Sequence, residues 1–180
     1  DEFVLVGLSI GGMWGVELAR MAPARLKGLV LMDSFVGLEP QITCERYLGM
    51  LAMIEQLGTI PAPIVEQVAP LFFADQPDAD LMSGFKARLA AWPADKVAAM
   101  VAVGRSFVTR EDRIEWLEAI SVPALVMTGS QDKARPVLEG YLMAEVLGCP
   151  FKEVPVAGHI ASLENPAFVN DQLGAFLAAL

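Results

Sequence analysis

Three short runs of consecutive apolar residues constrain the fold more than any other feature of this sequence. Each run has four residues, is rich in valine and leucine, and shows no alternation with polar residues. Such runs predict strands that are buried on both faces, as in parallel sheets. The runs lie at residues 3–6, 29–32 and 124–127, and we expect a fourth strand at residues 151–156.

Helical stretches separate these strands along the chain. We expect helices at residues 13–22, 112–120, 136–147 and 165–179. Gly148 is a typical helix stop, and Asn165 followed by Pro166 is a typical helix start. Strands that alternate with helices predict an α/β fold, with a parallel sheet of about four strands flanked by helices.

A different pattern fills the segment between the second and third strands. Apolar residues recur there at helical spacing in short pieces divided by prolines, and no strand pattern interrupts them. We expect four helices, at residues 45–57, 64–73, 79–91 and 94–107. The predicted organisation is therefore an α/β core at residues 1–33 and 111–180, with an inserted helical cap or lid at residues 34–110.

Composition excludes several classes of function. The net charge is −9, and lysine and arginine form no cluster, which argues against nucleic acid or an anionic membrane as a partner. No apolar run is long enough to span a membrane. Cys44 and Cys149 fit no metal-binding spacing, so we expect buried free thiols, although the two could also pair. Free thiols favour a cytoplasmic location, and we expect no metal or cofactor. A mean hydropathy of +0.47 indicates a large interior or an apolar surface that something else covers.

The first strand leads directly into a G-x-S-x-G motif centred on Ser9. A sharp turn between strand and helix would expose the hydroxyl as a nucleophile, and Gly7 and Gly11 would remove Cβ atoms that clash in such a turn. The backbone N–H of Ile10, at the start of the helix, could donate to an oxyanion. The alternative is a glycine-rich turn with a solvated serine, whereas the phosphate-binding glycine motifs do not fit.

Two further residues could complete a catalytic triad. His159 is the only histidine of the chain and follows the fourth strand, so it is the best candidate for a general base. Asp132 follows the third strand and could orient the imidazole, although it could equally cap the next helix. Asp33, after the second strand, is the rival acid. Parallel strands place all these positions at one edge of the sheet.

At this point the chain resembles the α/β-hydrolase superfamily, in its capped esterase, lactonase and C–C hydrolase branch. The resemblance rests on residues 4–12 (VLVGLSIGG), residues 120–132 (ISVPALVMTGSQD), and Gly158-His159 with Glu164-Asn165-Pro166 close behind. It implies a triad of Ser9, Asp132 and His159, Ile10 as oxyanion donor, and a substrate pocket between cap and sheet.

The sequence also differs from the superfamily in one large respect. Members of the superfamily begin with further strands and helices before the nucleophile strand, so we expect this chain to be the C-terminal part of the fold. The strand at residues 3–6 would then be an exposed apolar edge, which favours self-association.

The function predicted from these residues is hydrolysis of a small, hydrophobic ester through an acyl-enzyme. Acyl transfer, perhydrolysis and C–C bond hydrolysis use the same triad and remain alternatives, as does a non-catalytic chain on the same fold. The expected cap is rich in apolar residues that either pack its helices together or line a substrate pocket. They are Met50, Met53, Phe72, Phe73, Met82 and Phe85. The same two alternatives, packing or lining a pocket, apply to Met13 and Trp14 near Ser9.

Overall fold

The computed structural model describes residues 1–180 and contains two compact units. Unit 1 comprises Asp1–Val36, Leu71–Pro77 and Arg113–Leu180, and unit 2 comprises Gly37–Pro70 and Asp78–Asp112. The middle of the insertion expected at residues 34–110, Leu71–Pro77, therefore belongs to unit 1 and not to unit 2. That unit 2 serves as a cap stays a prediction.

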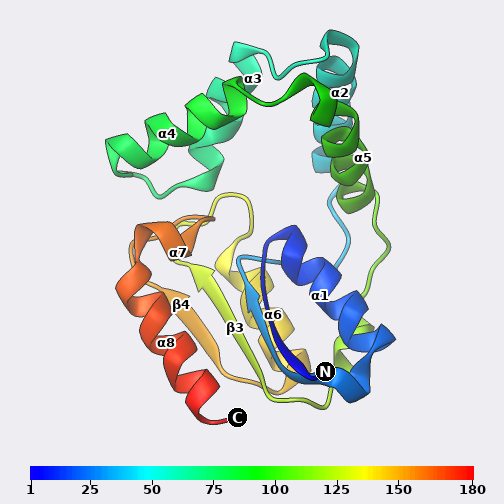
Figure 1. Ribbon diagram of the computed structural model, residues 1–180, viewed down its shortest axis with the longest axis vertical. Helices are drawn as coiled ribbons and strands as arrows, with labels where there is room; N and C mark the ends of the chain where they lie inside the picture. The colour runs from blue at the N-terminus through cyan, green and yellow to red at the C-terminus, as the bar shows by residue number, and fades with distance from the viewer. The chain divides into compact units, whose positions relative to one another are not determined.

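Unit 1 is built on a sheet of four parallel strands in the order β1-β2-β3-β4 (Figure 1). The strands are β1 (Phe3–Leu8), β2 (Leu26–Met32), β3 (Ala124–Gly129) and β4 (Phe151–Val154). The predicted α/β class, with about four parallel strands, is confirmed. Strand β4 ends two residues earlier than predicted, where Pro155 lacks a backbone N–H and Val156 has a φ of 52°.

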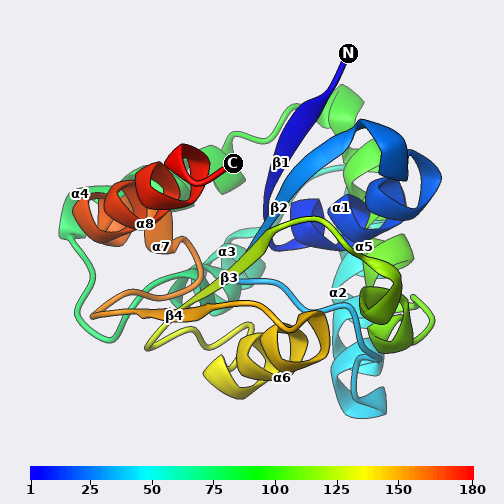
Figure 2. The same cartoon turned by 90° about the horizontal axis from the view of Figure 1, so that it is seen from below.

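Helices cover both faces of this sheet (Figure 2). Side chains of β2 alternate between two cores: Leu29 and Leu31 pack with one face, whereas Val30 and Met32 pack with the other. The first core is covered by α1 (Ile10–Met21), the 3-10 helix η4 (Ile114–Ala119) and α6 (Val137–Leu147). The second core is covered by α7 (Ala161–Glu164) and α8 (Pro166–Ala178).

Several predicted helix boundaries hold because the capping groups are present. Gly148 ends α6 in the left-handed conformation, with a φ of 61°. The Asn165 side chain accepts the N–H of Phe168 at 3.3 Å, and Pro166 is the first residue of α8. The helix predicted at residues 112–120 is a shorter 3-10 helix, and the four-residue α7 was not predicted.

Unit 2 consists of helices around its own apolar core. Its helices are α2 (Gln41–Leu57), α3 (Ala62–Val68), α4 (Ala79–Ala90), the 3-10 helix η3 (Ala94–Lys96) and α5 (Val97–Val108). The helix predicted at residues 64–73 ends at Val68 and continues as the 3-10 helix η2 (Ala69–Phe72), which contains Pro70. The core includes Ile54, Ile64 and Val101.

Strand β1 lies at one edge of the sheet, next to β2 only. Its Val6 side chain is 47% exposed, so part of this strand lacks cover. Self-association through β1 remains a prediction. No helix combines the length and the apolar character that crossing a bilayer requires.

Candidate active site

Ser9 occupies a sharp turn between the end of β1 and the start of α1. Its φ of 53° and ψ of −122° place a non-glycine residue in a region that is costly for L-amino acids. The turn is held by two bonds: the Ser9 N–H donates to the Met32 carbonyl at 2.8 Å, and the Ser34 hydroxyl donates to the Ser9 carbonyl at 2.7 Å. This is the strand–turn–helix geometry that a serine nucleophile needs.

Only one of the two glycines assigned to this turn is required there for steric reasons. A Cβ on Gly7 would lie 2.5 Å from the backbone carbon of Gly11, so Gly7 allows the close approach of strand and helix. A Cβ on Gly11 would meet nothing within 4 Å, so the role predicted for Gly11 is wrong. The second required position is Gly12, whose Cβ would lie 2.6 Å from the Ser34 hydroxyl oxygen.

His159 lies between the other two predicted triad residues. Its Nε2 is 2.8 Å from the Ser9 hydroxyl oxygen, and its Nδ1 is 2.9 Å from Asp132 Oδ2. The residue is 2% exposed, and the Phe72 ring meets the imidazole edge-on with a centroid separation of 5.1 Å. With Nδ1 protonated, the ring donates to the carboxylate and accepts from the serine, which is the tautomer that a general base requires.

Asp132 contacts His159 but does not cap the next helix, because Pro136 is the N-cap of α6 and no side chain caps this end. Oδ2 faces His159, while Oδ1 accepts the N–H groups of Ala134 and Arg135, each at 2.8 Å. These two bonds fix the carboxylate within the loop that follows β3. The aspartate thus closes a local turn before α6, while its other oxygen lies within hydrogen-bond distance of the imidazole.

Asp33, the rival acid, has a different environment. It is fully buried, its φ is 46°, and its Oδ1 accepts the N–H of Gly129 at 2.7 Å. Burial raises the pKa of the Asp33 carboxyl to about 8, and the nearby Asp132 charge adds to the rise although the Gly129 N–H opposes it. Burial therefore favours the protonated form of Asp33, and the carboxylate that contacts the imidazole is Asp132.

The oxyanion donor predicted from the sequence stands at the start of α1. Ile10 is the first residue of this helix, and the first-turn N–H groups of a helix have no partner within it. The helix dipole adds positive potential at this end. No three histidine, cysteine, aspartate or glutamate side chains of the chain are grouped so that they could hold a metal ion.

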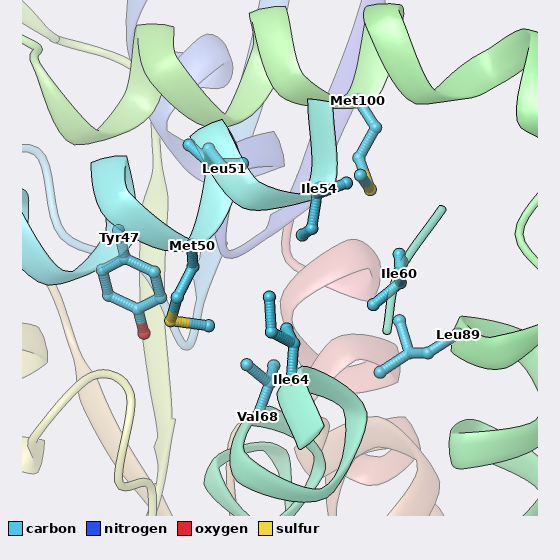
Figure 3. A pocket seen from close by; sticks show the side chains of 9 residues that line it. All are labelled: Tyr47, Met50, Leu51, Ile54, Ile60, Ile64, Val68, Leu89 and Met100. Carbon is cyan, nitrogen blue, oxygen red and sulfur yellow. The ribbon is translucent and has the colours of Figure 1, made fainter. Parts of the chain in front are cut away.

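The apolar residues expected in the cap divide between the two units. Phe73 is completely buried in unit 1, and Phe72 packs on His159. Met50 instead lines an apolar pocket of about 140 Å³ within unit 2 (Figure 3). The other side chains around this pocket are Tyr47, Leu51, Ile54, Ile60, Ile64, Val68, Leu89 and Met100.

Two residues near the site had no role predicted from the sequence. Ser34 supports the Ser9 turn, and Glu164 accepts the N–H of Gly158, which precedes His159. The side chains of both residues bond to backbone groups. Any residue type supplies such a backbone group, so the sequence contains no pattern that would reveal the bond. Only the position of Glu164 in the Glu-Asn-Pro stretch marked it at all.

Residues 1–172 match the model of the alpha/beta hydrolase family. The chain belongs to the α/β-hydrolase family. A curated relative of this α/β-hydrolase chain is 3-oxoadipate enol-lactonase 2 from Acinetobacter baylyi, which is 24% identical over 176 residues. The alignment covers 95% of the chain and 62% of the lactonase.

Solved structures show the same fold. A thermophilic esterase from Thermogutta terrifontis is 25% identical with a TM-score of 0.87, covering 99% of this α/β-hydrolase chain and 65% of the esterase. The putative non-heme bromoperoxidase BpoC from Mycobacterium tuberculosis H37Rv is 22% identical with a TM-score of 0.80, covering 98% of the chain and 66% of BpoC. The chain thus spans about two thirds of the length of these proteins.

Proposed function

We propose that the protein is a serine hydrolase of small carboxylic esters, with Ser9 as nucleophile, His159 as general base and Asp132 as the orienting acid. The observation that carries the proposal is the position of the His159 ring, within hydrogen-bond distance of both Ser9 Oγ (2.8 Å) and Asp132 Oδ2 (2.9 Å). The names of the esterase and lactonase relatives support ester-type substrates.

The reaction follows the usual two steps of acyl transfer. His159 Nε2 takes the Ser9 proton while Oγ bonds to the carbonyl carbon, and the carbonyl oxygen becomes an oxyanion near the Ile10 N–H. The C–O bond to the alcohol then breaks, and His159 returns the proton to the leaving oxygen. In the second step, water attacks the acyl-enzyme through the same base, so that the acid is released and Ser9 is restored.

Asp132 contributes by selecting the tautomer of His159 and by stabilising its positively charged form. Its carboxylate accepts from Nδ1, so it favours the tautomer whose Nε2 is free to take a proton, and it stabilises the imidazolium that forms. The two backbone N–H groups on Oδ1 keep this carboxylate in place during the cycle. Asp33 accepts the Gly129 N–H, and its raised pKa of about 8 favours the protonated form, so we assign it no part in the proton transfer.

A related proposal concerns the compartment. Cys44 and Cys149 are both free thiols in the structure, and burial raises the pKa of Cys149 to about 11. Unpaired cysteines are usual in a reducing compartment, where disulfides rarely persist. The two free thiols therefore support a location such as the cytoplasm.

Hydrolysis of p-nitrophenyl esters and of simple lactones tests the proposal. We expect saturable release of the acid by the wild type, and Ser9→Ala and His159→Ala should each lower kcat by about 10⁴-fold or more. Glu153→Gln changes an exposed carboxylate on β4 and is the matched control. No turnover above buffer by a folded wild type, or full activity of Ser9→Ala, would contradict the proposal.

Competing nucleophiles separate the related reactions. Methanol, hydroxylamine and hydrogen peroxide added to the same assay each yield a distinct product from the acyl-enzyme. Free acid as the main product supports hydrolysis, whereas a methyl ester, hydroxamate or peracid in excess indicates acyl transfer or perhydrolysis. All of these products still require Ser9 and His159.

A further inference from the structure

The segment Leu71–Pro77 contacts both of the loops that carry the proposed base and acid. It comes from the middle of the helical insertion in sequence, yet it packs with unit 1. Neither the proposed reaction nor the glycine-rich turn at Ser9 explains why this segment is bound so closely to the loops that carry His159 and Asp132.

The first set of contacts is with the loop that carries His159. The Ile160 N–H donates to the Phe72 carbonyl at 3.2 Å, and the Phe72 ring lies edge-on to the imidazole. Gly158 allows the two backbones to touch, because a Cβ there would lie 2.4 Å from the carbonyl carbon of Phe73. The segment therefore forms one wall around the imidazole.

The second set of contacts is with the residues on either side of Asp132. The Asp75 N–H donates to Gln131 Oε1 at 2.8 Å, and Lys133 Nζ donates to the Phe73 carbonyl at 3.2 Å. Lys133 is also 3.0 Å from Asp75, but the carboxylate of this pair is largely exposed. An exposed ion pair contributes little, so these contacts alone hold the segment weakly.

Glu164 supplies a stronger link, because its carboxylate binds the segment and the His159 loop together. The Gly158 N–H donates to Oε2 at 2.7 Å. The Ala74 N–H donates to Oε1 at 3.0 Å and to Oε2 at 3.2 Å. One carboxylate thus accepts the N–H groups of both segments, and the 2.7 Å bond from Gly158 has the short length of a charge-assisted bond.

We propose that Glu164 is a positioning residue, which joins Leu71–Pro77 to the loop before His159 and so fixes the imidazole between Ser9 and Asp132. The catalytic consequence rests on the proposed function, whereas the position of the imidazole can be measured independently of it. A small misplacement of a catalytic group costs a large factor in rate, so loss of this link lowers turnover without removing any reacting atom.

Two pairs of variants test the link. Glu164→Ala removes the acceptor of the Gly158 and Ala74 N–H groups. Glu164→Gln keeps the shape of the side chain, but it retains a single oxygen and turns an NH₂ group toward one of these N–H donors. Glu153→Gln is the control for the loss of charge. Gly158→Ala forces the segment away from the loop from the other side. Its matched control is Gly174→Ala in α8, where a Cβ would meet nothing within 4 Å.

Nuclear magnetic resonance gives a direct readout, because the chain has a single histidine. In the wild type, the Nδ1 proton held by Asp132 should give one sharp, downfield signal. We expect this signal to broaden or disappear in Glu164→Ala and Gly158→Ala, to weaken in Glu164→Gln, and to persist in both controls. Circular dichroism checks that each variant is folded.

The kinetic readout is the rate of Ser9 modification by a fluorophosphonate and the separation of kcat from KM for an ester. We expect Glu164→Ala to lower the modification rate constant and kcat by about 10-fold to 100-fold with KM nearly unchanged. Glu164→Gln should fall between this variant and the wild type. If Glu164→Ala does not fold, Glu164→Gln and Gly158→Ala carry the test.

A folded Glu164 variant with the histidine signal and the modification rate of the wild type would overturn the proposal. A uniform loss of both signal and rate in the two controls would overturn it as well, since the effect would not be specific. If the wild type resists the fluorophosphonate, the proposed function fails, but the histidine signal of the variants still decides whether Glu164 positions the ring.

Discussion

Replacement of Asp33 by asparagine should change how the stability of the protein depends on pH. Burial raises the pKa of this carboxyl from 3.8 to about 8. The folded state therefore keeps a proton that the unfolded state releases above pH 4, so this group destabilises the fold progressively as pH rises from about 4 to about 8. Asparagine imitates the protonated carboxyl, can still accept the Gly129 N–H, and does not ionise.

The size of the effect follows from the shift. Each pH unit between the two pKa values corresponds to about 1.4 kcal/mol. The difference in unfolding free energy, Asp33→Asn minus wild type, should therefore increase by about 4 kcal/mol from pH 5 to pH 8. The contributions of other titrating groups cancel in this difference. The sign is definite: the gain grows with rising pH.

Urea unfolding at each pH unit from 5 to 9 measures this difference. Carrying Trp92→Phe in both proteins leaves Trp14 and Trp116 as fluorophores, and both lie in unit 1 with Asp33. A difference in unfolding free energy that stays constant from pH 5 to pH 8 would refute the reasoning. It would mean that Asp33 is already ionised in the folded state at the lower end of this range.

Three further predictions concern other parts of the structure. Gly12→Ala should lower the unfolding free energy by about 1–3 kcal/mol in urea, because its Cβ would meet Ser34, whereas Gly11→Ala should cause no loss. Asp132→Asn should lower kcat for an ester by about 10⁴-fold with little change in circular dichroism, because the amide favours the wrong imidazole tautomer. Glu39→Gln should destabilise unit 2 by about 3–5 kcal/mol in calorimetry, because it leaves a buried arginine without its carboxylate at 2.7 Å.

The strands and the order of the site residues could be predicted from local patterns. Continuous apolar runs identify strands that are buried on both faces, and the ends of parallel strands meet at one edge of the sheet. This is why Ser9, Asp132 and His159, taken from three separate loops, come together in the structure. The helix stop at Gly148 followed from the same kind of local rule.

Features that depend on contacts between distant segments could not be predicted. The motif predicts close contacts at Gly7 and Gly11, whereas the position of Ser34 gives the second close contact to Gly12 instead of Gly11. Leu71–Pro77 resembles the rest of the helical insertion in composition, yet its partners lie in loops far along the chain. Glu164 binds backbone groups alone, so no residue pattern reveals its partners.

Covalent modification of Ser9 tests the central claim most directly. Purified protein is treated with a fluorophosphonate, and mass spectrometry counts and locates the adduct, beside Ser9→Ala and His159→Ala. We predict one adduct per chain, located on Ser9 and abolished by either substitution. A folded wild type that carries no adduct on Ser9, or a His159→Ala variant that is modified as fast as the wild type, would contradict the assigned roles.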